Sequence, residues 1–471
     1  MASSEAPSMT VDKREFRILL ENGEYWLGNK GDLAILDITI RRIAQRWPSA
    51  RIGVLTNRPS LLRAFEPAAE PVSYSTGGDW SSWNRLGRVP GFFGPTVAGP
   101  VLRVCVAAMT RIERLVRTAV APVRATKPKA GESSSTTKNP ARVALSRDGG
   151  LLPNAVADAS LVIAIGGGYL ADVDKFQTMR TLDLLEYAVT HRIPAVMLGQ
   201  GIGPIRDPEL IERAAAVLPK VDFIAVREDR RGPDLLRSLG VRSERIVVTG
   251  DDAVELAYCL RREELGTDIG VCLRVADYAP VGSSVQDSVG RIARGVAAET
   301  GAKLVPLIVS EHDSEDRRST LPLLAGFPAV ARPLGRFTRA RALAREVGRC
   351  RIVVTGAYHT AVFALSQGIP VVALSTSQYY DDKFGGLGSM FDSGIDVVRL
   401  DRDDVADRLP LAMRNAWDTA SETRSVLLAR ALEQIDASRL AFARAAELVE
   451  HEATVSRQTN PRPIEPPTFP K

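Results

Sequence analysis

Cysteine and histidine are scarce in this chain of 471 residues, which has only four of each. The cysteines (Cys105, Cys259, Cys272 and Cys350) are scattered without the spacing of a metal site or a disulfide framework, which predicts small core residues in a reducing compartment. No run of about 18 uncharged apolar residues is present. Residues 1–10 lack the basic and apolar regions of a signal peptide. The sequence therefore predicts a cytoplasmic protein without a bound metal.

Several sequence motifs of common enzyme classes are also missing. There is no G-x-x-x-x-G-K-[ST] phosphate loop and no G-x-S-x-G nucleophile elbow. The glycines at 166–168 do not continue with G-x-G-x-x-G spacing, which disfavours a nicotinamide enzyme. The net charge of +5 does not imply nucleic acid, because a groove for anionic ligands gives the same balance.

The chain does contain two series of predicted strands that alternate with predicted helices. Apolar runs predict a first series of strands at 16–20, 51–56, 161–165, 195–198, 223–226 and 246–249, and a second at 269–273, 303–308, 352–354 and 371–374. Helical periodicity separates them, for example at 33–47, 176–190, 285–299 and 359–367. Continuous apolar strands alternating with helices predict parallel sheets covered on both faces. We predict an α/β fold of two Rossmann-like domains, at 16–260 and 261–400, followed by helices at 401–455. Residues 1–15 and 456–471 are predicted to be disordered tails.

The alternation of strands and helices is interrupted between residues 77 and 150. We interpret this stretch as a partly disordered insertion. Within it, residues 101–120 predict an amphipathic helix with an apolar stripe and four arginines, preceded by G-F-F-G at 91–94. Residues 91–124 are therefore a candidate for contact with a membrane surface. The alternative is a lid helix packed on the host domain.

Glycine-rich loops follow four predicted strands, at 28–32, 166–168, 199–203 and 249–252. Ligands of open parallel sheets bind beyond the carboxyl ends of the strands, and glycine lets backbone N–H groups approach an anion closely. The residues predicted to line such a ligand cleft are Asn29, Gly31, Gly167, Gly168, Gln200, Gly201 and Asp251.

Charged candidates come from the second half of the chain. Arg274 ends a predicted strand, where a guanidinium can hold phosphate or carboxylate through two hydrogen bonds; the alternative is a surface arginine. His312 also follows a strand. His359 opens a helix after a strand, where an imidazole can bind a phosphate oxygen or deliver a proton. Lys383 lies in a predicted loop at 375–388, and both ligand binding and solvation fit it.

Six segments, taken in order, resemble the polysaccharide pyruvyl transferase family. They are G-N-K-G-D-L-A-I (28–35), I-G-G-G-Y-L (165–170), G-Q-G-I-G-P-I (199–205), A-V-R-E-D-R (225–230), T-G-D-D-A-V (249–254) and H-T-A-V-F-A-L-S-Q-G-I-P-V-V-A-L (359–374). The resemblance covers about 16–75 and 150–400. It implies a glycosyltransferase-B arrangement with the active site between the two domains. It also implies phosphoenolpyruvate as donor, a glycan or lipid-linked sugar as acceptor, a pyruvate ketal as product, and no metal or other cofactor.

The chain departs from the pattern of this family at one position. The family reads Ser-Arg-Leu-His where this chain has Gly356, Ala357, Tyr358 and His359, so the arginine expected to contact the donor is absent. Arg274 or Lys383 are candidates to compensate for it, or the chain uses another donor.

The chemistry of an enol phosphate assigns provisional roles. Carbon 3 must be protonated and a sugar hydroxyl must add to carbon 2. We predict His359 as the acid and phosphate contact, and Arg274 as the anion clamp. Lys383, Gly356 and His312 are predicted as further donor contacts. Asp32 is the predicted base on the acceptor side; its alternative is the N-cap of the helix at 33–47.

Two other functions fit the same architecture. One is a nucleotide-sugar transferase or epimerase, and the other is a non-catalytic binding subunit in glycan assembly. The sequence leaves the acceptor sugar and a homo-oligomeric state open. It places the protein in the cytoplasm, with a location on the inner face of the membrane as a further option through residues 91–124.

Overall fold

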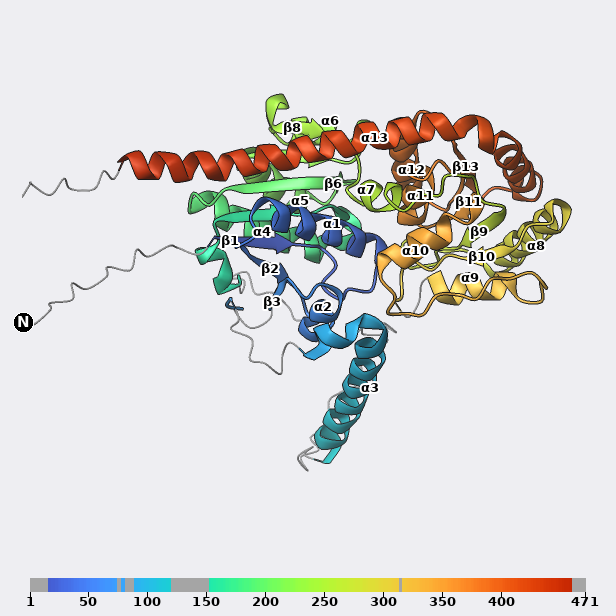
Figure 1. The fold of residues 1–471 in the computed structure, drawn as a ribbon, viewed down its shortest axis with the longest axis horizontal. Coiled ribbons are helices and arrows are strands. Elements are labelled where there is room, and N and C mark those ends of the chain that lie inside the picture. The colour runs from blue at the N-terminus through green and yellow to red at the C-terminus, as the bar shows by residue number, and fades with distance from the viewer. Residues whose placement is uncertain (1–15, 74–77, 81–88, 120–151, 313–315, 460–471) are drawn as a thin grey trace, which may run out of the picture.

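The structure is a computed structural model that describes residues 16–73, 78–80, 89–119, 152–312 and 316–459. It contains two parallel β-sheets with flanking helices, arranged side by side (Figure 1). The first sheet is built from β1 (Arg17–Glu21), β2 (Arg51–Leu55), β3 (Glu70–Val72), β4 (Leu161–Ala164), β5 (Gly167–Leu170), β6 (Ala195–Ile202), β7 (Phe223–Val226) and β8 (Ile246–Val248). The second is built from β9 (Asp268–Cys272), β10 (Leu304–Pro306), β11 (Cys350–Thr355), β12 (Val371–Ser375) and β13 (Ile395–Arg399).

Helices connect these strands. The helices of the first half are α1 (Lys30–Arg46), α2 (Pro59–Phe65), α3 (Val89–Ala119), α4 (Lys175–Thr190), α5 (Pro208–Val217), α6 (Gly232–Ser238) and α7 (Ala253–Tyr258). Those of the second half are α8 (Ser283–Thr300), α9 (Asp316–Leu324), α10 (Ala340–Val347), α11 (Tyr358–Leu365), α12 (Gln378–Phe391) and α13 (Val405–Thr459).

The strand order of each sheet contains a point at which the chain reverses its direction of travel. The first sheet has the order β3-β2-β1-β4-β6-β7-β8, with β5 paired to β6, so β1 and β4 are neighbours although two strands separate them in sequence. The second has the order β10-β9-β11-β12-β13, and its reversal lies between β9 and β11. In open parallel sheets, ligands bind at such reversal points beyond the carboxyl ends of the strands. Each half therefore offers one expected binding position.

The helix predicted at 33–47 begins earlier than the apolar pattern suggests. In α1, Asn29 is the N-cap, and its side-chain oxygen accepts a hydrogen bond from the Gly31 backbone N–H. Asp32 lies in the first turn of the helix, so the interpretation of Asp32 as the N-cap is wrong. Because the cap is already supplied by Asn29, the Asp32 carboxylate can serve another purpose.

The loop predicted at 375–388 is also wrong, since most of it belongs to α12. Gly385, Gly386 and Gly388 disfavour a helix by intrinsic propensity. Tyr380, Phe384, Leu387 and Phe391 nevertheless follow helical spacing and are buried on one face. Tertiary packing therefore overrides the propensity, and Lys383 is held on a helix instead of a loop.

Two further elements link the halves. The backbone of Asn29 pairs with that of Ser310, and Lys30 N donates to Val309 O over 3.0 Å. The long helix α13 runs from the second half back across the first (Figure 1), where Ser438 accepts a hydrogen bond from Arg42. These contacts bring the carboxyl ends of the two sheets together.

Helix α3 projects from the body of the protein (Figure 1) and bends at Gly94, where φ is 68°. The helix predicted at 101–120 is thus part of a longer one. In the described part of the chain, no helix is long and apolar enough to cross a membrane. The predicted tail at 1–15, residues 77, 81–88 and 120–150 of the predicted insertion, and residues 460–471 lie outside the described residues, whereas 456–459 belong to α13.

Candidate active site

A cavity of about 210 Å³ lies where the two reversal points meet. The first half contributes residues after β1, β4 and β7, and the second contributes residues after β9 and β11 and from α12. Its lining includes Glu24, Asn29, Asp32, Gly168, Asp174, Arg227, Arg274, Tyr278, Tyr358, His359, Tyr379, Tyr380 and Lys383. Charged groups of both signs are thus gathered in one small space.

His359 lies in the first turn of α11 and is 7% exposed. Its Nε2 is 3.6 Å from Asp251 Oδ2, and within the described ranges this buried nitrogen has no hydrogen-bond partner. The ring packs directly on α1, because a Cβ atom on Gly31 would lie 2.0 Å from it. The imidazole is therefore fixed in place and still has a ring nitrogen available for a ligand.

Asp251 holds this imidazole from the first half of the chain. One oxygen accepts a hydrogen bond from the Ala253 backbone N–H at 2.9 Å, and the other accepts one from Arg227 Nη1 at 3.2 Å. Burial raises the pKa of the carboxyl, but His359, Arg227 and the Ala253 N–H together outweigh burial and lower it below its usual value. Asp251 is therefore a buried anion that holds the Arg227 guanidinium and lies against the His359 ring.

Arg227 follows β7 and is buried. Its guanidinium lies 4.1 Å from the centre of the Tyr358 ring. Room for it comes from Gly201, where a Cβ atom would lie 2.6 Å from Nη2. The position of Arg227 is therefore set by Asp251, an aromatic ring and a glycine.

Lys383 reaches the same space from α12. Its Nζ lies 4.1 Å from the centre of the Tyr379 ring, and a Cβ atom on Gly168 would lie 2.7 Å from Nζ. Burial, together with the neighbouring guanidiniums of Arg227 and Arg274, holds the pKa of Lys383 well below its usual value. A bound anion would reverse this effect by favouring the charged amine.

Asp32 faces these cations from α1. Burial raises the pKa of its carboxyl to about 6, although His359 and Arg227 act in the opposite direction. Such a group is mostly ionised at neutral pH but takes a proton readily. It has the protonation behaviour expected of a general base.

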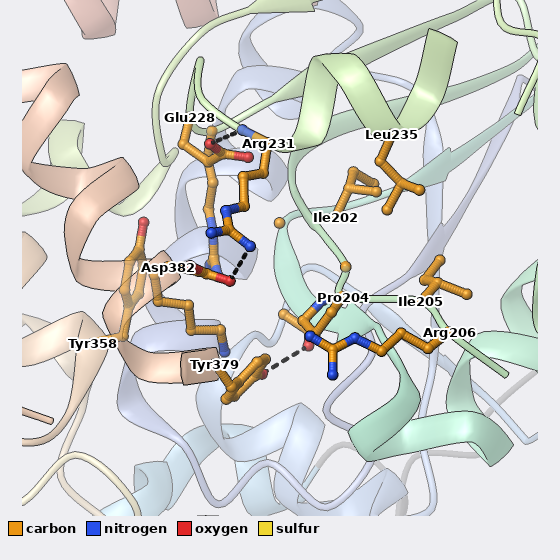
Figure 2. Close-up of a pocket in the computed structure, with 15 residues that line it drawn as sticks. Ile202, Pro204, Ile205, Arg206, Glu228, Arg231, Leu235, Tyr358, Tyr379 and Asp382 are labelled. Atoms are coloured by element: carbon orange, nitrogen blue, oxygen red, sulfur yellow. Dashed lines mark hydrogen bonds and ion pairs between the residues drawn. The ribbon is translucent and has the colours of Figure 1, made fainter. Parts of the chain in front are cut away.

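A second cavity, of about 230 Å³, adjoins the first. The two share Gly168, Arg227, Tyr358, Tyr379 and Lys383. Figure 2 shows the second cavity, with an ion pair of 2.8 Å between Arg231 and Asp382 on one side and the Pro204 segment on the other. The shared residues thus lie between two adjoining spaces.

Comparison with known proteins identifies the family. The model of the family described as polysaccharide pyruvyl transferase matches residues 29–378, which is most of the chain. The chain belongs to the polysaccharide pyruvyl transferase family. The resemblance of the six sequence segments is thereby confirmed, and the family membership indicates a transferase of polysaccharide biosynthesis. No curated protein matches the chain significantly.

Solved structures show the same architecture at low sequence identity. A protein of Listeria monocytogenes described as a UDP-N-acetylglucosamine 2-epimerase has a TM-score of 0.53 at 11% identity, with 93% of this chain and 97% of that chain covered. The UDP-GlcNAc 2-epimerase of Neisseria meningitidis bound to UDP-GlcNAc has a TM-score of 0.50 at 10% identity, with 92% and 100% covered. This likeness confirms two Rossmann-like domains in the glycosyltransferase-B arrangement.

The structure of this family member brings many of the predicted site residues together. Asn29, Asp32, Gly168, Arg274, His359 and Lys383 all line the first cavity, and Gly201 lines the second. Gly31 and Asp251 lie directly behind His359. Several of the glycines make room for side chains, a role different from the predicted approach of their backbone to an anion.

Other predicted residues lie elsewhere. Gln200 is fully buried in β6 and donates to the backbone oxygens of Ala164 and Ile165, so it joins strands and does not face the cleft. Gly167 belongs to β5 and packs against the Tyr169 ring. Gly356 packs against the Arg274 backbone, and neither glycine is among the residues that line the cavity. His312 is bound to Glu24 at 3.0 Å and lines a third cavity.

Arg274 is inside the cavity, which rules out the surface alternative, but its guanidinium already has an acceptor. Nε and Nη2 both donate to the Asp316 carboxylate, the latter at 3.0 Å, while Nη1 lies 3.4 Å from Tyr278 Oη. The two hydrogen bonds predicted for an anionic ligand are thus made with Asp316. Arg274 therefore fits the anion clamp less well than Arg227.

The sequence reasoning missed Arg227 itself. It directly follows the apolar strand β7 in the segment A-V-R-E-D-R, which is the pattern that singled out Arg274 after β9. Applying one rule to every strand end would have found it. The tyrosines of α11 and α12 carried no comparable signal, because tyrosine is common in buried cores. In the described ranges, no group of three or more His, Cys, Asp or Glu side chains is arranged to hold a metal ion.

Proposed function

We propose that this transferase moves pyruvate from phosphoenolpyruvate onto two hydroxyl groups of a sugar and forms a ketal. The observation that carries this proposal is that the lining of the first cavity combines two oppositely charged sets of residues. We call Arg227, Arg274, His359 and Lys383 the basic side, and Glu24, Asp32 and Asp174 the acidic side. Phosphoenolpyruvate carries a phosphate and a carboxylate, which suit the basic side. A sugar diol requires a base, which the acidic side supplies.

The donor would lie against the basic side. Arg227 presents a planar guanidinium beside Tyr358, and Lys383 presents an amine next to it. In this arrangement Arg227 does what the arginine missing at position 357 is expected to do in the family. Ala357 is fully buried and is not among the residues that line the cavity.

The reaction then needs two proton movements. His359 donates a proton to carbon 3 while Asp32 takes the proton of the first sugar hydroxyl, whose oxygen forms a bond to carbon 2. The carbon–oxygen bond to phosphate breaks next, and phosphate leaves with its electron pair. The second hydroxyl adds to carbon 2 and releases its proton to the departing phosphate, which completes the ketal. Asp251 keeps the imidazole oriented during the first step.

We further propose that catalysis needs neither a metal nor an organic cofactor, and that the enzyme works in the cytoplasm on the inner face of the membrane. Phe92 and Phe93 on α3 support the membrane contact, since they are 86% and 62% exposed. Replacing both with serine should reduce co-sedimentation with vesicles that contain phosphatidylglycerol while leaving the melting temperature unchanged. Equal pelleting of both proteins would remove the membrane contact from the proposal.

Thermal unfolding with candidate ligands tests the donor. Phosphoenolpyruvate in the presence of EDTA should stabilise the protein by about 2.7 kcal/mol at a hundredfold excess over its dissociation constant. Phosphate release and the new ketal methyl signal should then be measured by NMR with a panel of sugar diols. Loss of stabilisation in EDTA would contradict metal independence.

A nucleotide sugar is the second candidate donor, because the structurally similar Neisseria protein is bound to UDP-GlcNAc. A thermal shift with a UDP-sugar and none with phosphoenolpyruvate would favour a nucleotide-sugar enzyme. A shift with neither ligand would favour a non-catalytic binding subunit.

A further inference from the structure

A third cavity, of about 470 Å³, lies outside the catalytic site. Five segments of the chain form it: residues 26–28 and 57–61 of the first half, residues 99–105 of α3, and loops at 311–312 and 336–337 of the second half. Gly99 lets α3 come close to the second half, because a Cβ atom there would lie 2.2 Å from the Phe337 ring. The projecting helix is thus joined to both halves at this cavity.

The cavity is basic. Arg58, Arg103 and Arg336 line it, and Glu311 is its one acidic residue among those described. Glu311 pairs with Arg336 at 3.6 Å, but it is shared with Lys30 at 2.8 Å and with Arg317 at 2.6 Å, neither of which lines the cavity. One carboxylate thus serves three cations, so Arg336 is only partly compensated by it.

Arg58 shows this imbalance most clearly. Its guanidinium lies 4.8 Å from the centre of the Trp26 ring, and no described carboxylate lies within ion-pair distance of it. Burial lowers the pKa of Arg58, as expected for a cation withdrawn from water without a counter-ion. A bound anion would provide the missing partner.

An apolar surface begins next to this basic cavity. Leu102, Arg103 and Cys105 line the cavity from α3, and on the same helix Val97, Val101 and Val104 are exposed together with Phe92 and Phe93. Figure 1 shows this helix leading away from the body of the protein. A ligand bound by the arginines can thus extend along an apolar helix.

Only one short loop separates the third cavity from the catalytic one. Leu27 and Gly28 line the third cavity, whereas Glu24 and Asn29 line the catalytic cavity. The bond of 3.0 Å between His312 and Glu24 joins the two linings. An apolar surface, a basic cavity and a site for a sugar therefore follow one another along the molecule.

We propose that the third cavity binds the phosphate or diphosphate group of a lipid-linked acceptor, whose hydrocarbon chain lies along α3 and whose sugar reaches the catalytic cavity. The order of apolar, anionic and sugar groups in such an acceptor matches the order of the three surfaces. The sugar part of this proposal rests on the proposed function, but binding of the lipid phosphate does not.

Calorimetric titration with farnesyl diphosphate, without phosphoenolpyruvate, tests the proposal directly. The protein should bind it at least tenfold more tightly than pyrophosphate, which lacks the chain, and than farnesol, which lacks the charge. Arg58→Gln and Arg336→Gln should each weaken binding about tenfold. Both should fold, since Arg58 has no described ion pair and Glu311 keeps Lys30 and Arg317. Arg111→Gln, an exposed residue of α3 that does not line the cavity, is the matched control.

Each outcome supports or contradicts the proposed binding of a lipid phosphate in the third cavity. Equal affinity for pyrophosphate would mean a simple anion site, and equal affinity for farnesol would mean a simple apolar site; either overturns the proposal. Undiminished binding by both cavity variants would place the ligand elsewhere. Because His359→Ala should bind farnesyl diphosphate normally, failure of pyruvyl transfer and failure of this site give different results. In the protein with Phe92 and Phe93 replaced by serine, vesicles of phosphatidylcholine with phosphatidylglycerol should not compete with farnesyl diphosphate for the cavity, and full competition would assign the cavity to bulk anionic lipid.

Discussion

The two sheets contribute opposite charge to the same cavity. The first half contributes Glu24, Asp32 and Asp174 to the lining, and the second half contributes Arg274, His359 and Lys383. The two sets already interact in the free protein, since His359 lowers the pKa of Asp32 against the effect of burial. A donor that is an anion and an acceptor that must lose protons can each meet a suitable side.

Arg227 is the exception that connects the two sides. It comes from the first half but lies on the basic side, between Asp251 of its own half and Tyr358 of the other. His359 of the second half in turn depends on Asp251. The residues that we propose to be catalytic are therefore oriented only when the two halves are together, and neither half is expected to be active by itself.

Removing the acid of the second half should have the largest effect. His359→Ala should lower kcat by about 10²–10⁴-fold, or about 3–5 kcal/mol of barrier, because a general acid is lost. His359→Asn should restore hydrogen bonding but little activity. His191→Ala, at an exposed position far from the cavity in sequence and fold, is the control. A His359→Ala enzyme that melts much earlier but keeps its specific activity at low temperature would show that the ring has only a packing role.

Removing the base of the first half should have a somewhat smaller effect, with a distinctive pH dependence. Asp32 must be ionised to act, and its pKa is about 6, so kcat/KM should fall as the pH drops below about 6. Asp32→Asn should lose about 10²–10³-fold in kcat and should lack this acid limb. Retention of the limb in Asp32→Asn would assign the titration to another group.

Asp32→Asn should also change the free energy of unfolding, and the direction of the change follows from the pKa of Asp32. Since burial raises the folded-state pKa of Asp32 from 3.8 to about 6, the folded protein binds more protons between these values, and stability falls as the pH rises through them. Asp32→Asn should therefore be more stable than the original at pH 7, by up to about 3 kcal/mol. The difference should shrink as the pH approaches 4, which melting curves at several pH values can measure.

The two arginines provide a direct comparison between the halves. Arg227→Lys keeps the charge but loses the planar contact with Tyr358, so kcat/KM for phosphoenolpyruvate should fall about 10–100-fold. Arg274→Lys should mainly lower the melting temperature, because its two hydrogen bonds to Asp316 are internal. A larger increase of KM in Arg274→Lys than in Arg227→Lys would restore Arg274 as the anion clamp.

Much of the fold could be predicted because parallel strands covered on both faces are continuous apolar runs. β7 was predicted with its observed bounds. The misses are elements whose apolar pattern is masked by glycines or is too short to recognise. Helix α12 contains three glycines and is stabilised by packing, and the three-residue strand β3 is too short to show a pattern.

From the sequence, residues of the site could be predicted only where they follow the carboxyl end of a strand. That rule placed His359, Arg274 and Asp251 near one another, but it does not say which side chains face the cavity. Gln200 follows the same rule and is turned into the sheet. Nor does it reveal that Arg274 meets Asp316, 42 residues away in sequence. Such pairings depend on tertiary contacts that a single sequence does not display.

The smallest predicted effect concerns a glycine of the first half that meets a lysine of the second. Gly168→Ala would place a Cβ atom 2.7 Å from Lys383 Nζ and 3.2 Å from Arg227 Nη2. Both atoms end long side chains, so they can shift without moving the backbone. We expect KM for phosphoenolpyruvate to rise about two- to fivefold, with kcat and the melting temperature nearly unchanged, because the loss of a well-aligned charged contact costs on the order of 1 kcal/mol. Gly295→Ala, where a Cβ atom meets nothing within 4 Å on helix α8, is the control and should raise stability by about 0.5–1 kcal/mol without changing KM. A Gly168→Ala enzyme with normal KM would mean that Lys383 does not touch the donor, and the basic side would then rest on Arg227, Arg274 and His359 alone.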